Sequence, residues 1–202
     1  MKNISQLFFI FFAVVLVTNC KNTLPRNTAS ETITINALEV DKKELELNPI
    51  EAKWYYKGHP FNGYSIKYYP NGTVEERLGF YKGKREGIAK RWSKNGVLRV
   101  ESFYKNNRLT GTYKSWWENG NLGSQTAYLK GEINGVEKKW YPNGVLAKER
   151  QLVNGKEEGM QKAWLQNGAL YVNYEAKNGR IFGMKRANSC YQLEDEVVVR
   201  SK

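Results

Sequence analysis

Trp140-Tyr141-Pro142-Asn143-Gly144 is the stretch of sequence that decides the fold, because its Asn-Gly pair returns every 24 residues along the chain. The pair occurs five times in this register without insertion or deletion, at Asn71-Gly72, Asn95-Gly96, Asn119-Gly120, Asn143-Gly144 and Asn167-Gly168. A second glycine series keeps the same step, at Gly63, Gly87, Gly111, Gly135, Gly159 and Gly183. Self-similarity at a fixed period of this size is the signature of a repeat array.

The residues around this turn have the pattern of β-strands. Alternation after Gly135 places Val136, Lys138 and Trp140 on one face and Glu137, Lys139 and Tyr141 on the other. Pro142 fixes φ at the first turn position and Gly144 takes the left-handed one, which favours a three-residue turn of type I with a glycine bulge. An extended pattern resumes at Val145, and Asn154-Gly155 with Gly159 turns the chain into the next unit. Each repeat is therefore predicted to be one β-hairpin.

Hairpins stacked in sequence order predict an all-β fold, an elongated single-sheet array of tandem antiparallel β-hairpins. Equivalent residues of neighbouring repeats then lie two strands apart, about 9 to 10 Å. We interpret the apolar files along the array as its core, because a thin sheet has little else to bury. These files are Tyr68, Trp92, Trp116, Trp140 and Trp164; Tyr64, Ile88, Thr112, Val136, Met160 and Met184; and Val74, Leu98, Leu122, Leu146 and Leu170.

The N-terminus has the features of an export signal. Met1-Lys2 is positively charged, and the apolar run from Leu7 to Val17 is 11 residues long, shorter than the roughly 20 residues that a membrane-spanning helix needs. We therefore expect residues 1–19 to be a cleaved signal peptide. The residues Val17-Thr18-Asn19-Cys20 resemble a bacterial lipoprotein signal, which implies lipidation of Cys20, although a small residue is usual where Asn19 stands.

The alternative is a secreted protein whose Cys20 carries no lipid. If Cys20 is lipidated, Cys190 has no partner for an intrachain disulfide, and stability must come from packing. Lys21 rather than Asp follows the cysteine, so the lipoprotein resemblance implies the outer membrane over the inner one.

The sequence divides into four segments. We predict a signal peptide at 1–19, a lipidated N-terminus and polar tether at 20–48, the hairpin repeats at 49–190 and a C-terminal tail at 191–202. The repeats comprise about five full units and a C-terminal capping unit. Within the tether, Glu39 to Leu47 alternates enough to add one edge strand.

The positive charge of the chain lies in the repeats. Residues 51–190 hold 25 Lys and Arg against 12 Glu and no Asp. One cation recurs per repeat beside the tryptophan file, at Lys90, Lys114, Lys138, Lys162 and Arg186. A spacing of about 9 to 10 Å is close to the Debye length of about 8 to 10 Å, so these cations would act together on a polyanion. They are our candidate partner-binding residues; the alternative is a solvated row whose methylene stems cover the Trp rings.

Catalytic and metal sites are not predicted. The single histidine, His59, and Cys190 lie 131 residues apart, which excludes a Cys-His pair within one molecule of this array. No histidine cluster suits zinc, no Asp between residues 42 and 194 could serve a calcium loop, and no glycine motif suits a phosphate. We expect no cofactor, no metal and no small-molecule substrate, and export argues against nucleic acid despite the basic, aromatic-rich composition.

Units of the form aromatic-x-x-Gly-x-x-x-Gly-x-x-x-x-Trp/Tyr-Tyr/Trp-Pro-Asn-Gly-x-Leu resemble the bacterial variant of the membrane occupation and recognition nexus (MORN) repeat. The resemblance covers residues 54–187, and residues 128–146 are its cleanest copy. Asn107 replaces the first glycine of the third unit, and Gly58 is displaced by one residue in the first. Such proteins are often grouped as YwqK-like antitoxins, which implies toxin neutralisation by direct contact. An export signal does not suit a cytosolic antitoxin.

From the sequence we expect an exported, lipid-anchored, non-catalytic repeat protein of the bacterial cell envelope that binds an acidic macromolecular partner, such as a protein, through its basic array. One alternative is a rigid envelope spacer or self-associating protein that uses its open sheet edges. Another is an antitoxin-like protein.

Overall fold

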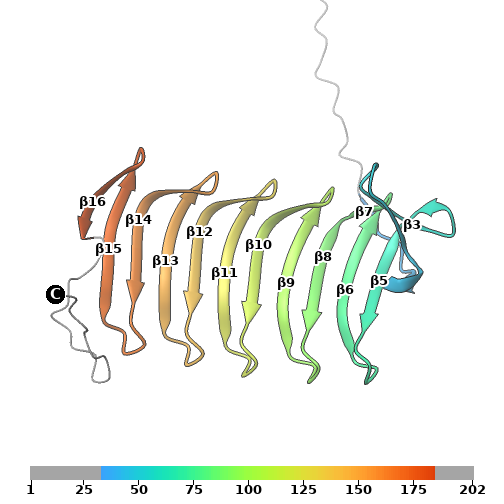
Figure 1. The fold of residues 1–202 in the computed structure, drawn as a ribbon, viewed down its shortest axis with the longest axis horizontal. Coiled ribbons are helices and arrows are strands. Elements are labelled where there is room, and N and C mark those ends of the chain that lie inside the picture. Colours follow the sequence, from blue (N-terminus) through green and yellow to red (C-terminus); the bar gives the residue numbers. More distant parts are fainter. Residues whose placement is uncertain (1–32, 185–202) are drawn as a thin grey trace, which may run out of the picture. The chain divides into compact units, whose positions relative to one another are not determined.

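A computed structural model describes residues 33–184 of the chain, and most of them lie in β-strands joined by short turns (Figure 1). The elements before the repeats are β1 (Glu39–Asp41), the 3-10 turn η1 (Lys42–Glu44), β2 (Glu46–Asn48), β3 (Lys53–Tyr56) and β4 (His59–Pro60). The repeats contribute β5 (Gly63–Tyr68), β6 (Val74–Tyr81), β7 (Lys84–Arg85), β8 (Gly87–Trp92), β9 (Leu98–Lys105), β10 (Arg108–Trp116), β11 (Leu122–Leu129), β12 (Glu132–Trp140), β13 (Leu146–Val153), β14 (Lys156–Trp164), β15 (Leu170–Lys177) and β16 (Arg180–Met184). In this part of the chain no helix is both long and apolar enough to span a membrane.

The repeats form one open sheet of tandem hairpins, as predicted. From β5 to β16 each long strand pairs antiparallel with the next one in the chain, within a 13-stranded sheet. Corresponding strands recur in the same order across the sheet (Figure 1). The fold class expected from the 24-residue period is confirmed.

The Asn-Gly pairs close one end of each hairpin with the predicted turn. In the fourth copy, Gly144 N donates to Tyr141 O and Tyr141 N donates to Val145 O, both at 2.9 Å. Gly144 has φ +87°, the left-handed conformation that the bulge position requires. Asn143 Oδ1 accepts a hydrogen bond from Val145 N at 3.1 Å, which fixes the turn from within.

The connections between hairpins are two-residue turns in which both residues have positive φ. Asn154 and Gly155, for example, have φ +49° and +75°, as a primed turn with the twist of the flanking strands requires. Gly159 was predicted to belong to this turn, which is wrong: it lies within β14, has φ +95°, and sits where the pairing of β13 with β14 shifts register. Gly111 and Gly135 lie at equivalent register shifts, so these members of the second glycine series mark β-bulges. The strands are bowed (Figure 1).

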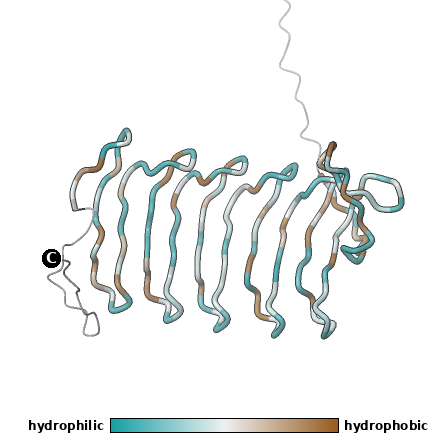
Figure 2. Tube along the Cα trace, viewed as in Figure 1, coloured by the Kyte–Doolittle hydropathy of each residue, from teal (hydrophilic) through white to brown (hydrophobic). Residues whose placement is uncertain are grey.

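The two faces of the sheet differ in burial. Ala89, Glu137 and Gln161 are 5%, 5% and 2% exposed, whereas the preceding residues Ile88, Val136 and Met160 are 52%, 40% and 41% exposed. We call the face that carries Glu137 the inner face and the face that carries Val136 the outer face. Among the described residues no second layer packs on β10 to β15, so the burial there comes from the bend of the strands. Figure 2 shows short hydrophobic and hydrophilic stretches alternating along the repeats.

The interpretation of the apolar files as the core is wrong. No described member of those three files is among the buried residues; they lie half-buried or exposed on the outer face. The largest buried cluster lies instead on the inner face of the first strands. It contains Val40, Leu45, Phe61, Leu78, Phe80 and Ala89, with Trp54, Tyr56 and Tyr104 packed against it.

Residues 39–61 cover the inner face of the first repeats. β1 pairs in parallel with β5, with Glu39 opposite Tyr64, and β2, β3 and β4 form a separate three-stranded sheet. Trp54 N donates to Gly83 O at 2.7 Å, which ties this segment to the first two-residue turn. β1, η1 and β2 thus lie within the segment assigned from the sequence to the polar tether, where one edge strand was expected between Glu39 and Leu47.

Candidate binding surface

The outer face carries the predicted row of cations, interleaved with other polar residues. Lys90 lies opposite Glu101, Lys114 opposite Glu101 and Gln125, Lys138 opposite Gln125 and Glu149, and Lys162 opposite Glu149 and Asn173. The row is therefore a mixture of cations, carboxylates and amides across the strands. Two candidate residues, Arg186 and the lipidation site Cys20, lie outside the described residues.

Only alternate cations of this row are paired. Lys90 Nζ lies 3.3 Å from Glu101 Oε2, and Lys138 Nζ lies 2.9 Å from Glu149 Oε2. Lys114 and Lys162 form no ion pair within residues 33–184. No lysine of the row stacks on a tryptophan ring in that range, whereas Arg77 lies 3.6 Å from the ring centroid of Tyr64. The outer face thus presents two unpaired cations spaced two repeats apart.

Aromatic side chains border these cations. A recess of about 370 Å³ opens on the outer face between Tyr68 and Trp92, with Ile66 and Val74 in its wall. The equivalent tryptophans of later repeats, Trp116, Trp140 and Trp164, are half-buried. Such a surface offers apolar contact beside positive charge, a composition common at recognition sites.

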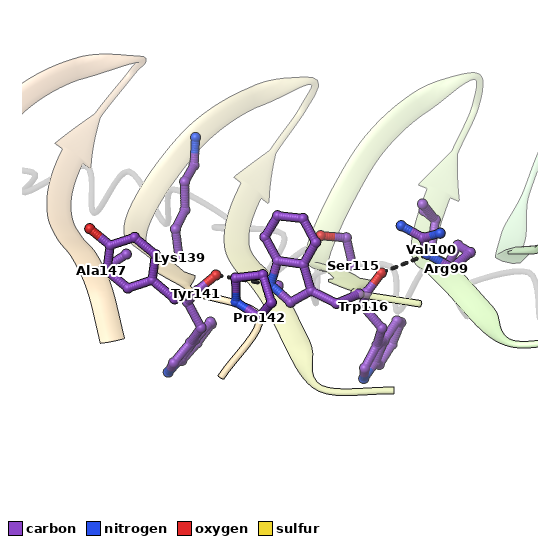
Figure 3. A pocket seen from close by; sticks show the side chains of 11 residues that line it. Arg99, Val100, Ser115, Trp116, Lys139, Tyr141, Pro142 and Ala147 are labelled. Carbon is purple, nitrogen blue, oxygen red and sulfur yellow. Dashed lines mark hydrogen bonds between the residues drawn. The ribbon is translucent and has the colours of Figure 1, made fainter. Parts of the chain in front are cut away.

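A larger recess lies between two repeats near the Asn-Gly turns. It has a volume of about 530 Å³ and is lined by Val100, Trp117, Lys139, Tyr141 and Ala147, among others. Figure 3 shows Lys139 and Tyr141 at one end of the recess and Arg99 and Val100 at the other. The lining is mostly apolar with two cations, Arg99 and Lys139, and each of them has a carboxylate partner, Glu118 and Glu137.

Farther along the inner face lies a buried ion network. Glu137 accepts from Arg150 Nε at 2.7 Å, and the Arg150 Nη2 atom lies 2.6 Å from the same oxygen. Tyr174 donates to Glu157 Oε2 at 2.7 Å. Burial, together with this hydrogen bond, raises the pKa of Tyr174 to about 12. Arg150, Glu157 and Tyr174 border a recess of about 440 Å³ that is also lined by Lys148, Ala163 and Val172.

Hydrogen bonds between neighbouring repeats hold the Asn-Gly edge in register. Tyr69, Trp117 and Tyr141 donate from their side chains to the carbonyl oxygens of Trp92, Trp140 and Trp164, at 2.9, 3.0 and 2.9 Å. Asn119 Nδ2 donates to Pro142 O at 2.8 Å, from one turn to the next. Sequence reasoning missed these contacts. A signal was present, because a second aromatic residue follows the first at Tyr69, Trp117 and Tyr141, in the same 24-residue register.

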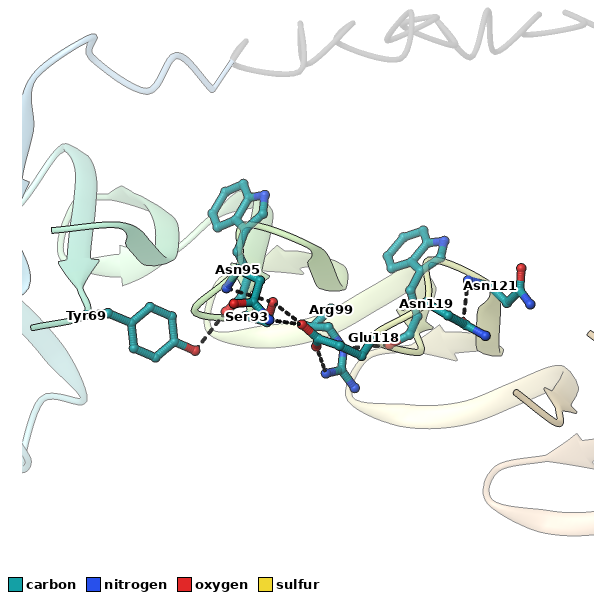
Figure 4. Close-up of polar contacts among 9 residues, drawn as sticks. Tyr69, Ser93, Asn95, Arg99, Glu118, Asn119 and Asn121 are labelled. Carbon is teal, nitrogen blue, oxygen red and sulfur yellow. Dashed lines mark hydrogen bonds and ion pairs between the residues drawn. The ribbon is translucent and has the colours of Figure 1, made fainter. Parts of the chain in front are cut away.

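The repeat that has Ser93 in place of this aromatic residue is held by other side chains. Arg99 Nε donates to Trp116 O at 2.7 Å, and Glu118 pairs with Arg99 Nη1 at 2.7 Å (Figure 4). Glu118 also accepts from Ser93 Oγ and Asn95 Nδ2, at 2.8 and 3.0 Å. The Ser93 hydrogen bond first, then those from Asn95 and Arg99, lower the pKa of Glu118 below its ordinary value.

Within residues 33–184 the structure contains no group of three or more His, Cys, Asp and Glu side chains that could hold a metal ion. His59 lies exposed in β4, and Cys190 lies outside the described residues. The polar groups that do cluster, such as Glu137 and Arg150, pair with one another inside the fold.

Comparison with known families matches the MORN repeat variant four times, at residues 61–82, 85–106, 109–128 and 133–154. Each match spans the strands and the Asn-Gly turn of one hairpin. The hairpin of β14 and β15 has the same turn, with Gly168 N donating to Leu165 O at 2.9 Å. A search of curated proteins found no match.

Proposed function

Because this chain is a MORN-repeat protein, built from a non-catalytic type of repeat that generally binds proteins or membranes, we propose that it binds an acidic macromolecular partner through its basic, aromatic-rich array. The binding residues are Lys114 and Lys162, with Lys90, Lys138 and Arg186 as further members of the row. The partner carries acidic groups on an extended surface. No catalytic step is part of this proposal.

The observation that carries the proposal is the pairing pattern on the outer face. Lys90 and Lys138 each have a glutamate within 3.3 Å, whereas Lys114 and Lys162 have none in the described residues. An unpaired lysine beside a half-buried tryptophan keeps its charge available and adds apolar contact area. Carboxylates or phosphates of a partner would pair with Lys114 and Lys162, as Glu101 and Glu149 pair with Lys90 and Lys138.

The proposed location is the bacterial cell envelope, with Cys20 lipidated and the outer membrane as the site of attachment. The support comes from the residues before Cys20, which have the pattern of a lipoprotein signal. Labelling with a palmitate analogue tests this: the wild-type chain should take up label, and Cys20→Ser should not. Release of an unlabelled chain into the medium would favour the secreted alternative.

A rigid spacer is the second candidate, and the hydrogen bonds between repeats favour it. The contacts from Tyr69, Trp117 and Tyr141 each join one repeat to the next. A sheet fixed in this way at every step would hold its two ends at a constant separation without binding any partner along its length. The antitoxin-like alternative predicts that the captured partner is a toxin.

Charge exchange on the outer face tests the binding proposal. The variant Lys114→Glu/Lys162→Glu should lose the salt-sensitive partner in a pull-down from envelope extract while keeping the circular dichroism spectrum of the wild type. The matched variant Glu101→Gln/Glu149→Gln frees Lys90 and Lys138 and should retain or strengthen the same interaction. If both variants capture the same partners as the wild type, the outer-face row is not the binding site and the spacer gains support.

A further inference from the structure

The inner-face recess of about 440 Å³ at β13, β14 and β15 has a lining that the repeat pattern does not dictate. Ala163 in its wall stands where the preceding repeat has Lys139, and it lies opposite the equally compact Val172. These short side chains leave open space between the longer ones around them. The volume falls within the range of roughly 300 to 1,000 Å³ that is typical of small-molecule sites.

A buried amide oxygen without a partner belongs to this lining. Gln161, which lines the recess, is 2% exposed, and its Nε2 donates to the carbonyl oxygens of Gln151 and Gly159 at 2.8 and 3.2 Å. Two carbonyl acceptors require the nitrogen on their side, so the orientation of the amide is fixed and Oε1 points away from them. Within residues 33–184 this oxygen accepts no hydrogen bond. A buried acceptor in this state is unfavourable, and a donor from a bound molecule would satisfy it.

A lysine without a counter-ion lines the same recess. Lys148 is half-buried and forms no ion pair in the part of the chain that the structure describes. It lies directly opposite Lys139 on the neighbouring strand, and like charges in this arrangement destabilise a sheet. Lys139 reaches Glu137 only at 3.6 Å, and two nitrogens of Arg150 already engage that carboxylate. An anion bound at Lys148 would offset this repulsion.

These observations define the chemistry of the ligand. It carries an anionic group for Lys148, a donor for Gln161 Oε1 and an apolar face for Ala163 and Val172. The ring of Tyr171, which also lines the recess, adds an aromatic surface. A bare phosphate would leave the apolar lining unused, and an aliphatic acid would leave Gln161 Oε1 without a donor.

The donor is expected to be a hydroxyl group. Cations exceed carboxylates around the recess, with Lys139, Lys148 and Arg150 against Glu137 and Glu157, so a ligand ammonium would be repelled. A sugar acid combines a carboxylate, hydroxyl groups and the apolar C–H face of its ring. Aromatic side chains such as tyrosine supply the large, flat apolar surface against which such a face can pack.

We propose that the inner-face recess binds a sugar acid, with its carboxylate at Lys148, a hydroxyl donating to Gln161 Oε1 and its ring against Ala163, Val172 and Tyr171. This goes beyond the proposed function, because the site lies on the other face of the sheet and takes a small ligand. It was not predicted from the sequence, since Gln161 and Lys148 have no counterparts of their own kind in the preceding repeat.

Titration calorimetry on the full chain tests the proposal with three matched probes. Galacturonate has all of the required groups, galactose lacks the carboxylate, and cyclohexanecarboxylate lacks the hydroxyls. Galacturonate should bind to one site per chain, and each of the other two should bind about tenfold more weakly or less. No binding of galacturonate, or equal binding of cyclohexanecarboxylate, overturns the proposal.

Substitutions locate the site. Lys148→Gln should weaken galacturonate binding about tenfold and leave galactose binding unchanged, whereas Lys114→Gln, an unpaired lysine of the outer face, should behave as the wild type. Ala163→Leu fills the recess and should abolish binding of the sugar acid. Because Ala163 is 2% exposed, a thermal melt checks that this variant is folded; Lys148→Gln, at a half-buried position, decides the question if it is not. Equal affinity of Lys148→Gln and the wild type for galacturonate overturns the proposal.

A fourth probe distinguishes two sources of the ligand. Digalacturonate should bind more tightly than galacturonate if the natural ligand is part of an acidic glycan, and no more tightly if it is a free sugar acid; either result supports the recess as a sugar-acid site. The outcome is independent of the outer face, because Lys148→Gln should still capture the partner in the pull-down. Loss of that capture along with galacturonate binding would contradict a separate inner-face site.

Discussion

Arg99 donates from Nε to the carbonyl oxygen of Trp116 at 2.7 Å, and so makes the contact that an aromatic side chain makes in neighbouring repeats. Tyr69 reaches the equivalent oxygen of Trp92, and Trp117 that of Trp140. Position 93 holds a serine, which is too short to span the gap, and its hydroxyl bonds to Glu118. The repeat thus loses one donor and gains another from the adjacent strand. The contact between repeats is kept while the residue that makes it changes.

The first prediction concerns this contact. Arg99→Ala should lower the free energy of unfolding by about 1 to 3 kcal/mol, since it removes a charged donor from a backbone carbonyl and leaves Glu118 without its cation. Adding Ser93→Tyr to that variant should recover part of the loss, because tyrosine makes this contact at positions 69 and 141. Urea denaturation measures both. A double variant no more stable than Arg99→Ala would contradict the equivalence.

A milder change tests the same contact elsewhere in the array. Tyr141→Phe removes only the hydroxyl that donates to Trp164 O and should cost about 1 kcal/mol. Tyr113→Phe is the matched control, because the Tyr113 hydroxyl makes no hydrogen bond within residues 33–184, and it should stay within about 0.5 kcal/mol of the wild type. Equal losses for the two variants would show that the Tyr141 bond does not contribute.

The second prediction concerns Asn107, which stands where the equivalent turns have glycine. Its φ of +67° favours glycine, so the backbone alone would gain from Asn107→Gly. The side chain, however, accepts from Arg85 N and donates to Ala52 O, both at 2.7 Å. We expect Asn107→Gly to destabilise by about 1 kcal/mol in thermal unfolding, because two hydrogen bonds outweigh the relief of a left-handed residue. If Asn107→Gly is more stable than the wild type, the preference of glycine for positive φ outweighs the two hydrogen bonds of Asn107.

Periodicity was sufficient to predict the hairpins, the Asn-Gly turn and the strand alternation. Residues such as Asn143 and Gly144 act locally: the turn they form depends on their own backbone and on the next two residues. Their repetition removes the usual uncertainty about which strand pairs with which, since each unit meets only its neighbours. The alternation of Val136 and Glu137 between faces is equally local, because it follows from the extended backbone.

The burial of each face could not be predicted, because it depends on the bend of the strands. Hydropathy placed Val136 and Trp140 in the core, whereas the structure buries Glu137 on the opposite face. Glycines such as Gly159 bend the strands at bulges, and this turns the Glu137 face inward. A short segment, residues 39–61, then covers that face at one end of the array. Neither the direction of bending nor the covering segment follows the 24-residue pattern.

The candidate site was only partly accessible to sequence reasoning for a similar reason. The row from Lys90 to Lys162 was visible as a repeat, but Glu101 and Glu149 come from the other strand of each hairpin, and their pairing depends on register. The cations at the two-residue turns between hairpins were not noticed, because they occupy changing positions around these turns, as Lys130 and Lys156 illustrate. A count of charges at each end of the predicted hairpins would have indicated them.

The third prediction concerns the ion pair between Glu137 and Arg150. Glu137 is 5% exposed and Arg150 donates to it through two nitrogens. Glu137→Ala should destabilise by about 3 to 5 kcal/mol, because it leaves the half-buried guanidinium with only the more distant Glu157. Glu137→Leu/Arg150→Leu removes both charges and should cost much less. If the double variant is as unstable as Glu137→Ala, the loss comes from packing rather than from an unpaired charge.

The fourth prediction concerns pH and rests on Tyr174. Its pKa in the fold, about 12, lies above the ordinary value of 10.0 because of burial and then the hydrogen bond to Glu157. A group whose pKa is raised by folding stabilises the fold fully below its unfolded pKa, and this stabilisation is lost as pH rises through the folded value. Tyr174 should therefore contribute in full at neutral pH and lose its contribution between about pH 10 and pH 12.

Melting temperatures at a series of alkaline pH values measure this effect as the difference between the wild type and Tyr174→Phe. The phenylalanine variant should be less stable at neutral pH, by about 1 kcal/mol for the lost hydrogen bond, and its stability should fall less steeply above about pH 10. The difference is needed because burial also raises the pKa of Tyr128 and Tyr141, which contribute to the slope of the wild type. Glu157→Gln leaves Tyr174 buried and should keep most of the fall in stability that Tyr174 causes above about pH 10, since burial is the main cause of its raised pKa. Equal slopes of stability against pH for the wild type and Tyr174→Phe would exclude Tyr174 as the source of this fall.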